Sequence, residues 1–163
     1  MNLLANLPAP LALFLISCGP NNIYKLPENY QGATATIRDS YTVNSKNNFK
    51  AQIYTVDQID GQRDNDSPYR FVQGAGPVTH VQDASRKIPI KETILTLGGR
   101  EVYGADGFAL MDWTKKKSVS GDVYFLPKAG RTYEVRGQVG KNSSSVWLVD
   151  LSNGKQVGRK ITQ

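Results

Sequence analysis

Side chains that commonly carry catalysis or bind metals are scarce in this chain. It has one histidine, His80, and one cysteine, Cys18, among 163 residues. A Ser-His-Asp or Cys-His catalytic system would have to use His80, which lies in the strand-like stretch 78–81 with no Gly-x-Ser-x-Gly turn nearby. A zinc site needs several His or Cys ligands, which one of each cannot supply. We therefore predict no catalytic residue, no metal site and no cofactor.

Four aspartates lie close together in the sequence and raise the question of a cation site. Asp57, Asp60, Asp64 and Asp66 fall within ten positions, and Asp64-Asn65-Asp66 matches part of a calcium loop. The invariant Gly and the closing Glu of an EF-hand are missing. A solvated acidic loop is therefore the preferred interpretation, with calcium as the alternative.

The single cysteine ends an apolar leader. Residues 1–17 read MNLLANLPAPLALFLIS and carry no charge. The run is too short to cross a bilayer as a helix, which needs about 20 residues, and it predicts a signal peptide over 1–17. The tetrapeptide Leu15-Ile16-Ser17-Cys18 resembles a bacterial lipobox. That resemblance implies cleavage before Cys18 and a diacylglycerol on its sulfur, although an ordinary secretory signal followed by a free cysteine is the alternative.

The lipobox resemblance also implies a location and a domain plan. Gly19 follows the cysteine, where an Asp would resemble an inner-membrane retention signal, so we expect the periplasmic face of the outer membrane. Residues 18–32 are polar after the cysteine and predict a flexible tether, and residues 33–163 predict one domain. Because no cysteine follows Cys18, this domain cannot use internal disulfides.

The charge balance favours no single partner. Lys and Arg number 20 against 14 Asp and Glu, a net charge of +6. Nucleic acid is not expected as a partner of an exported protein. Lipopolysaccharide phosphates, phospholipid head groups and peptidoglycan carboxylates are the anionic alternatives, and a spread of charge that keeps the protein soluble is the simpler interpretation.

Beyond the tether, apolar and polar residues alternate between turn signals, as in an all-β protein. Roughly eight short strands are predicted, which favours one antiparallel β-sandwich, with a barrel as the alternative. One short helical turn is expected over 81–87. Turns are expected at Asp60-Gly61, Gly98-Gly99, 127–130 and Asn153-Gly154. The expected strands cover 33–40, 49–56, 88–97, 102–113, 119–126, 131–139, 146–149 and 156–161.

The alternation also predicts which side chains face the core. In the strand over 49–56, one face is expected to be buried, formed by Phe49, Ala51, Ile53 and Thr55. In the strand over 131–139, one side is formed by Tyr133, Val135 and Gly137. Pro89 lacks a backbone donor and is expected at a strand start or an edge.

Four fragments carry a wider resemblance. "ATIRDS", "AQIYTVDQIDG", "VYFLPKAGRTYEVRG" and "VWLVDLSNGKQVG" occur in this order over most of residues 33–158. The pattern resembles small envelope lipoproteins of unknown function from Acinetobacter and related Gram-negative bacteria. The resemblance implies an envelope-anchored β-sandwich and no established activity.

One segment combines an aromatic residue with a tight basic run. Trp113 precedes Lys115, Lys116 and Lys117, so we take these four as a possible binding surface. The overall prediction is a non-enzymatic binding or envelope-assembly component with a protein partner. A glycan- or lipopolysaccharide-binding module and an enzyme of unrecognised type are the alternatives. A protein partner predicts an apolar patch or open edge strand, a glycan predicts exposed aromatics, and an enzyme predicts converging polar groups.

Overall fold

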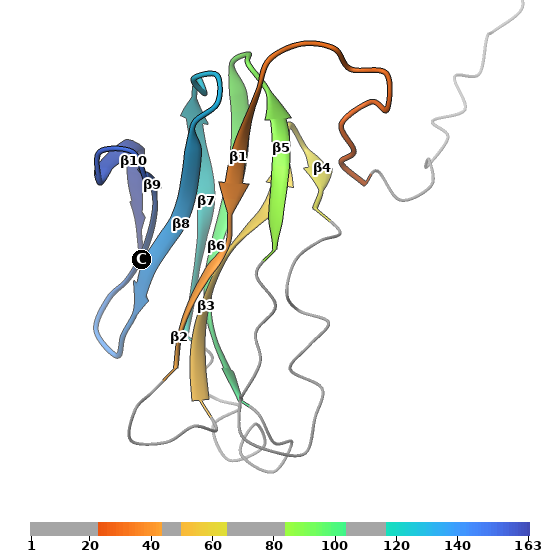
Figure 1. The fold of residues 1–163 in the computed structure, drawn as a ribbon. Coiled ribbons are helices and arrows are strands. Elements are labelled where there is room, and N and C mark those ends of the chain that lie inside the picture. Colours follow the sequence, from red (N-terminus) through yellow and green to blue (C-terminus); the bar gives the residue numbers. More distant parts are fainter. Residues whose placement is uncertain (1–22, 44–49, 65–83, 104–116) are drawn as a thin grey trace, which may run out of the picture.

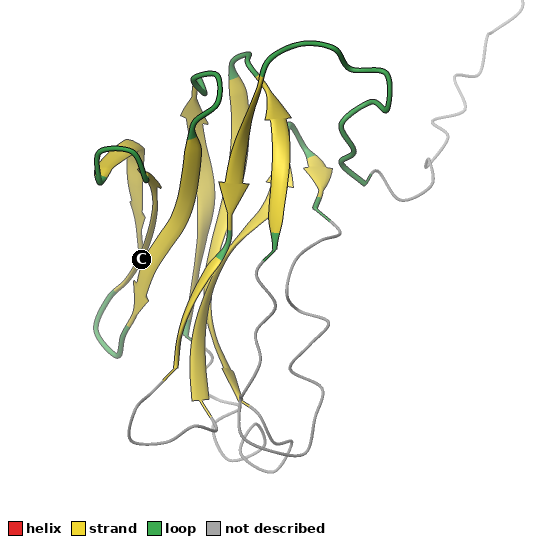
Figure 2. Cartoon of the chain, viewed as in Figure 1, coloured by secondary structure: helices red, strands yellow, loops and turns green. Residues whose placement is uncertain are grey.

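The chain folds as a sandwich of two β-sheets, and no helix occurs among the residues that the structure describes (Figures 1 and 2). The structure is a computed structural model and describes residues 23–43, 50–64, 84–103 and 117–163. The all-β prediction is confirmed, and the sheets do not close into a barrel. The strands are β1 (Thr34–Arg38), β2 (Ser40–Val43), β3 (Lys50–Ile59), β4 (Gln62–Arg63), β5 (Ser85–Pro89), β6 (Thr93–Tyr103), β7 (Ser118–Phe125), β8 (Thr132–Val139), β9 (Ser144–Asp150) and β10 (Lys155–Thr162).

The first sheet has the order β10-β9-β8-β1-β5, and the second has the order β2-β3-β6-β7 with β4 paired to β3. Only β1 and β8 pair in parallel among the strand pairs of the described chain, and all others are antiparallel. Apolar side chains from both sheets fill the space between them, with Leu95, Leu97 and Leu148 fully buried. No helix in the described part of the chain has the length and apolar character needed to cross a bilayer.

The chain passes from one sheet to the other at Asp39. We expected one strand over 33–40, and this is wrong, because β1 ends at Arg38 and β2 begins at Ser40 in the second sheet. The buried Asp39 carboxylate accepts a hydrogen bond from the Val56 amide at 3.0 Å. It also receives two from the Arg86 guanidinium, at 2.7 and 2.8 Å. Burial raises the pKa of Asp39, and the Arg86 and Val56 donors oppose that shift.

Strand β3 is buried on both faces, which the alternating pattern did not predict. Ala51, Ile53 and Thr55 are buried as expected. The residues that join the core between the sheets, however, are Tyr54 and Val56 on the opposite face, together with Ile59 after the shift in register with β6. The expected strand was therefore correct in position, but its predicted buried face is not the one that meets the other sheet.

The segment 88–97 is wrong as a single strand. Its first residues end β5 at Pro89, the chain turns at Ile90-Lys91, and β6 begins at Thr93. Pro89 does lie on an edge strand, as expected. The Gly98-Gly99 pair does not end the strand, because β6 continues through it. A Cβ at Gly98 would meet the carboxylate of Asp57, so close packing explains the glycine there.

Apart from Gly98-Gly99, the expected tight turns are confirmed. Asp60 and Gly61 both have positive φ, 50° and 76°, and connect β3 to β4. Gly154 has φ 69° in the turn between β9 and β10. Asp150 accepts hydrogen bonds from the Ser152 amide at 2.8 Å and the Ser152 hydroxyl at 2.6 Å, and these lower its pKa. In contrast, the helical turn expected over 81–87 is wrong for its described part, where β5 begins at Ser85.

The described part of the expected tether contacts the domain. Ile23 forms a parallel bridge with Arg63, and the Tyr24 amide donates to the Arg63 carbonyl at 2.8 Å. The Tyr24 hydroxyl donates to the Lys87 carbonyl of edge strand β5 at 3.0 Å. Burial, with smaller effects from nearby Asp60 and other groups, raises the pKa of Tyr24 to about 12. This contact places the start of the described chain beside β4 and β5 (Figure 1).

Candidate functional site

Most of the residues that the sequence offered as a site lie outside the described residues. These are Cys18, Trp113, Lys115 and Lys116. His80, for which no catalytic role was predicted, also lies outside them. Lys117 is described: it is partly buried, and its carbonyl accepts the Glu101 amide at 3.3 Å just before β7 begins. The structure therefore neither assembles nor separates the proposed basic and aromatic surface.

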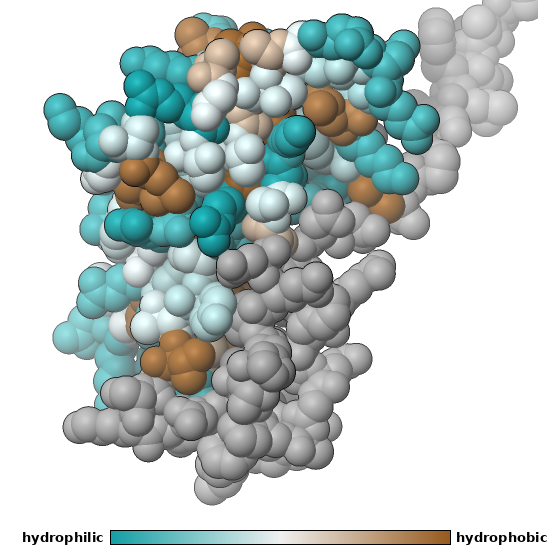
Figure 3. Space-filling view, in the orientation of Figure 1, coloured by the Kyte–Doolittle hydropathy of each residue, from teal (hydrophilic) through white to brown (hydrophobic). Residues whose placement is uncertain are grey.

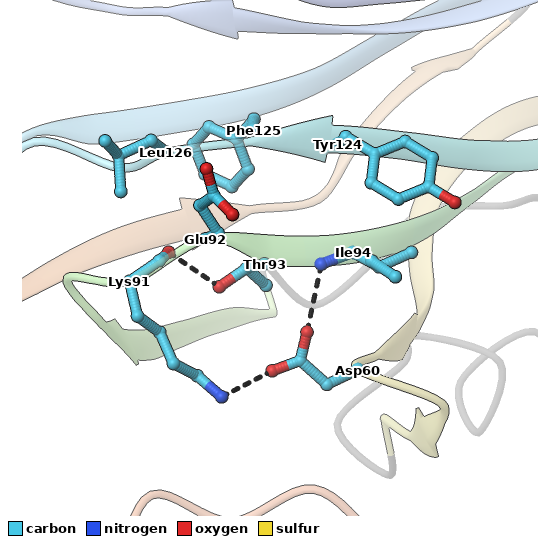
Figure 4. Close-up of a pocket in the computed structure, with 8 residues that line it drawn as sticks. All are labelled: Asp60, Lys91, Glu92, Thr93, Ile94, Tyr124, Phe125 and Leu126. Carbon is cyan, nitrogen blue, oxygen red and sulfur yellow. Dashed lines mark hydrogen bonds and ion pairs between the residues drawn. The ribbon is translucent and has the colours of Figure 1, made fainter.

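A pocket of about 730 Å³ lies at the end of β7 that is opposite Lys117. Figure 4 shows the residues that line it. Three segments form it: the β3–β4 turn, the β5–β6 turn with the start of β6, and the end of β7. Its volume falls within the range of ordinary ligand pockets, about 300–1,000 Å³. The lining residues are Asp60, Lys91, Glu92, Thr93, Ile94, Tyr124, Phe125 and Leu126.

The polar side chains of this pocket mostly bind one another. Asp60 accepts a hydrogen bond from the Ile94 amide at 2.9 Å and forms an ion pair with Lys91 at 2.8 Å. The Thr93 hydroxyl donates to the Lys91 carbonyl at 3.0 Å. Burial raises the pKa of Asp60, but the Lys91 and Ile94 donors outweigh it, so the pKa lies below its ordinary value. These contacts fix the shape of the turns, and Glu92 remains exposed at the pocket.

Beside its exposed charged residues Lys91 and Glu92, this pocket presents three exposed apolar side chains. Ile94 and Tyr124 are cross-strand partners on β6 and β7, and Leu126 directly follows β7. Their exposed fractions are 37% for Ile94, 68% for Tyr124 and 60% for Leu126. We call these three residues the apolar patch. Large hydrophobic side chains gathered on one surface mark interaction sites more often than isolated ones do.

Alternation along β7 explains why the patch is exposed. Val123 and Phe125 point into the core, and Phe125 packs edge-on against Tyr133 with ring centroids 5.1 Å apart. Tyr124 and Leu126 therefore point to the opposite face. The sequence contained this signal, an apolar run in which alternate residues must face outward. Sequence reasoning missed the site because the alternation was used to identify core residues and not the apolar residues that it leaves exposed on the opposite face.

The three described aspartates of the cluster each pair with a different basic side chain. Asp57 pairs with Arg100, Asp60 with Lys91, and Asp64 with Arg86. The interpretation as a solvated acidic loop is wrong for Asp64, whose side chain is only 2% exposed. No group of three or more potential metal ligands occurs within the described ranges. Asp66 lies outside the described residues.

Comparison with known proteins does not place the chain in a family. No protein-family model matches it. No curated protein and no solved structure matches it either. The resemblance to small envelope lipoproteins therefore stays a prediction.

Proposed function

We propose that this protein is a non-enzymatic, lipid-anchored component of the bacterial envelope that binds a protein partner through the apolar patch. The observation that carries the proposal is the grouping of Ile94, Tyr124 and Leu126 on one surface, with Tyr124 and Leu126 more than half exposed. Tyrosine supplies a large contact area at low entropic cost and is enriched among residues that dominate binding energy.

The rim of the patch indicates which partner surface would fit. The Asp60–Lys91 pair is electrically balanced. Glu92 is exposed and has no ion-pair partner among the described residues. The rim is therefore net negative beside an apolar centre. We propose a partner surface that presents an apolar side chain to the patch and a lysine or arginine to Glu92, since such complementarity favours one orientation of docking.

Anchoring would make weak binding sufficient. The lipobox resemblance places a lipid on Cys18, and more than one acyl chain is needed for stable attachment to a membrane. Confinement to the outer-membrane surface raises the effective concentration of every other component held there. A small patch of this kind can then recognise its partner without a large interface.

Site-specific crosslinking in cells tests the proposal. A photoreactive amino acid would replace Tyr124 in one version of the full chain and Tyr41, exposed at 42% on a different strand, in another. We expect a discrete protein adduct from position 124 and none from position 41. Tyr124→Ser and Leu126→Ser should weaken binding of the identified partner about 30-fold, corresponding to about 2 kcal/mol for a dominant contact.

Two results would contradict the proposal. Position 124 could give no adduct, or the two positions could give the same one. Mass spectrometry of the wild-type chain, with Cys18→Ala as control, separately tests the lipid. An unmodified Cys18 would remove the anchoring part and leave the patch to be judged by the crosslinks.

A further inference from the structure

The outer face of the first sheet carries a second feature that is independent of the apolar patch. Neighbouring strands place Arg38 beside Glu134, and Arg136 opposite Trp147. The Lys160 ammonium lies over the Trp147 ring, 4.3 Å from its centroid. These five residues form a row across β1, β8, β9 and β10, which we call the basic row. This side of the sandwich, with β1, β5 and β8 in front, is seen in Figure 3, where hydrophilic residues surround isolated hydrophobic ones.

The charges of the basic row do not cancel. Arg38, Arg136 and Lys160 are cationic, and Glu134 is the one carboxylate of the row. The Arg136 Nε donates to Glu134 Oε1 at 2.7 Å, which balances one positive charge. Lys160, which lies over the Trp147 ring, adds a further positive charge to the row. Guanidinium groups match carboxylate and phosphate geometry closely, so this surface favours an anion.

A groove of about 390 Å³ opens beside the basic row. It follows the edge of β8 where β1 leaves to enter the other sheet as β2, so that β8 has lost its strand neighbour there. The Ser40 hydroxyl donates to the Val135 carbonyl on this edge. The Gln52 side chain binds both backbone groups of Val139, at 2.6 and 3.0 Å. The side chains of Ser40 and Gln52 thus bind backbone groups of β8 that β1 no longer reaches, and the groove lies beside these contacts.

The groove combines hydroxyl, aromatic and charged groups, and its two carboxylates, Asp39 and Glu134, are paired with Arg86 and Arg136. Ser40 and Thr42 contribute hydroxyls, and Tyr41, which is 42% exposed, contributes an aromatic ring and a third hydroxyl. Trp147 and Arg136 line its outer side. Sugars present hydroxyls and apolar C–H faces together, and an aromatic ring with polar neighbours complements both.

We propose that the groove and the basic row bind an anionic saccharide, one whose sugar ring carries a carboxylate or a phosphate. The sugar ring would contact Tyr41 and the edge of Trp147, while its anionic group would bind Arg136 and Lys160. The Lys160–Trp147 contact holds the ammonium beside the aromatic ring, so that both are presented to one sugar. This site differs from the Trp113–Lys117 segment that the sequence suggested for glycan binding.

The test uses the full chain with Cys18→Ala, labelled with nitrogen-15 and titrated by NMR. The chain has two tryptophans, and a Trp113→Phe version assigns the indole signal of Trp147. The probes are a galacturonic acid tetramer, glucose 6-phosphate and neutral maltotetraose. We expect the Trp147 indole to shift with an anionic sugar, with at least tenfold weaker binding of maltotetraose. The first two probes show whether carboxylate or phosphate is preferred.

Matched variants locate the site. Arg136→Gln and Lys160→Gln should each weaken binding about tenfold, and raised salt should weaken it further. Lys155→Gln removes an equal charge from the same strand β10, outside the row, and should change affinity less than twofold. Tyr124→Ser should leave sugar binding intact, which separates this site from the apolar patch. Equal binding of neutral and anionic sugars, equal effects of all three charge variants, or no Trp147 shift at millimolar sugar would each overturn the proposal.

Discussion

Replacing Arg86 should show how strongly this fold depends on one buried cation. Its guanidinium makes contacts of 2.7 and 2.8 Å with Asp39 and of 2.7 Å with Asp64. The three side chains are 2–3% exposed. In Arg86→Met the methionine fills similar space, but two carboxylates remain buried without their cation.

The expected loss follows from the cost of those carboxylates. Breaking a buried ion pair by removing one partner costs about 3–5 kcal/mol. The upper limit is the cost of protonating both carboxylates at pH 7. At 1.36 kcal/mol per pH unit from an unfolded pKa of about 3.9, this is about 4 kcal/mol each, or about 8 kcal/mol. We therefore expect a loss between about 3 and 8 kcal/mol at pH 7, a large part of the 5–15 kcal/mol typical of a domain.

The loss should also depend on pH with a definite sign. Burial raises the pKa of Asp39, and Arg86 opposes that rise. Without Arg86 the pKa of Asp39 would rise further, so the folded variant would bind more protons than folded wild type. The stability of the variant relative to wild type should then rise as pH falls from 7 to 5, by up to about 3 kcal/mol if the Asp39 carboxylate protonates.

Urea denaturation of wild type and Arg86→Met at several pH values between 5 and 7 measures the difference in their free energies of unfolding. A triple variant, Arg86→Met with Asp39→Asn and Asp64→Asn, removes all three charges and should recover most of the lost stability, because no unpaired buried charge remains. A loss below about 1 kcal/mol in Arg86→Met, or a loss that is the same at pH 5 and pH 7, would refute the reasoning.

Two further predictions concern packing and titration elsewhere in the sandwich. Gly137→Ala should lose about 3 kcal/mol, the upper end of the range for overpacking, because its Cβ would enter the space of the Tyr54 ring and approach the Ser145 carbonyl oxygen. Gly154→Ala, whose Cβ meets nothing within 4 Å but whose φ is 69°, should lose only about 1 kcal/mol in the same urea assay; equal losses would contradict the packing argument. The Tyr24 phenol should titrate near pH 12 in the absorbance difference between wild type and Tyr24→Phe. Because its folded-state pKa is raised, the stability that Tyr24 adds should be complete below pH 10 and decline as pH rises toward 12; a difference titration near pH 10 would show that Tyr24 is not docked.

The sequence by itself determined the fold class and many of the turns. Asp60-Gly61 and Asn153-Gly154 supply residues that adopt positive φ at low cost, so these reversals are encoded locally. Alternation along 131–139 was sufficient to place Tyr133 and Val135 in the core, because side chains on a strand point to opposite faces by geometry alone.

Only the tertiary structure decided how the strands share the two sheets and which surfaces remain open. Asp39 ends one strand and begins another because Arg86, far away in sequence, fixes its carboxylate inside the sandwich. Strand β3 is buried on both faces, so the local alternation could not tell which face meets the other sheet. The apolar patch and the basic row are formed by residues that strand pairing brings together across the sheets. Local sequence sets the direction of each side chain, whereas long-range pairing sets its neighbours, and binding surfaces depend on the neighbours.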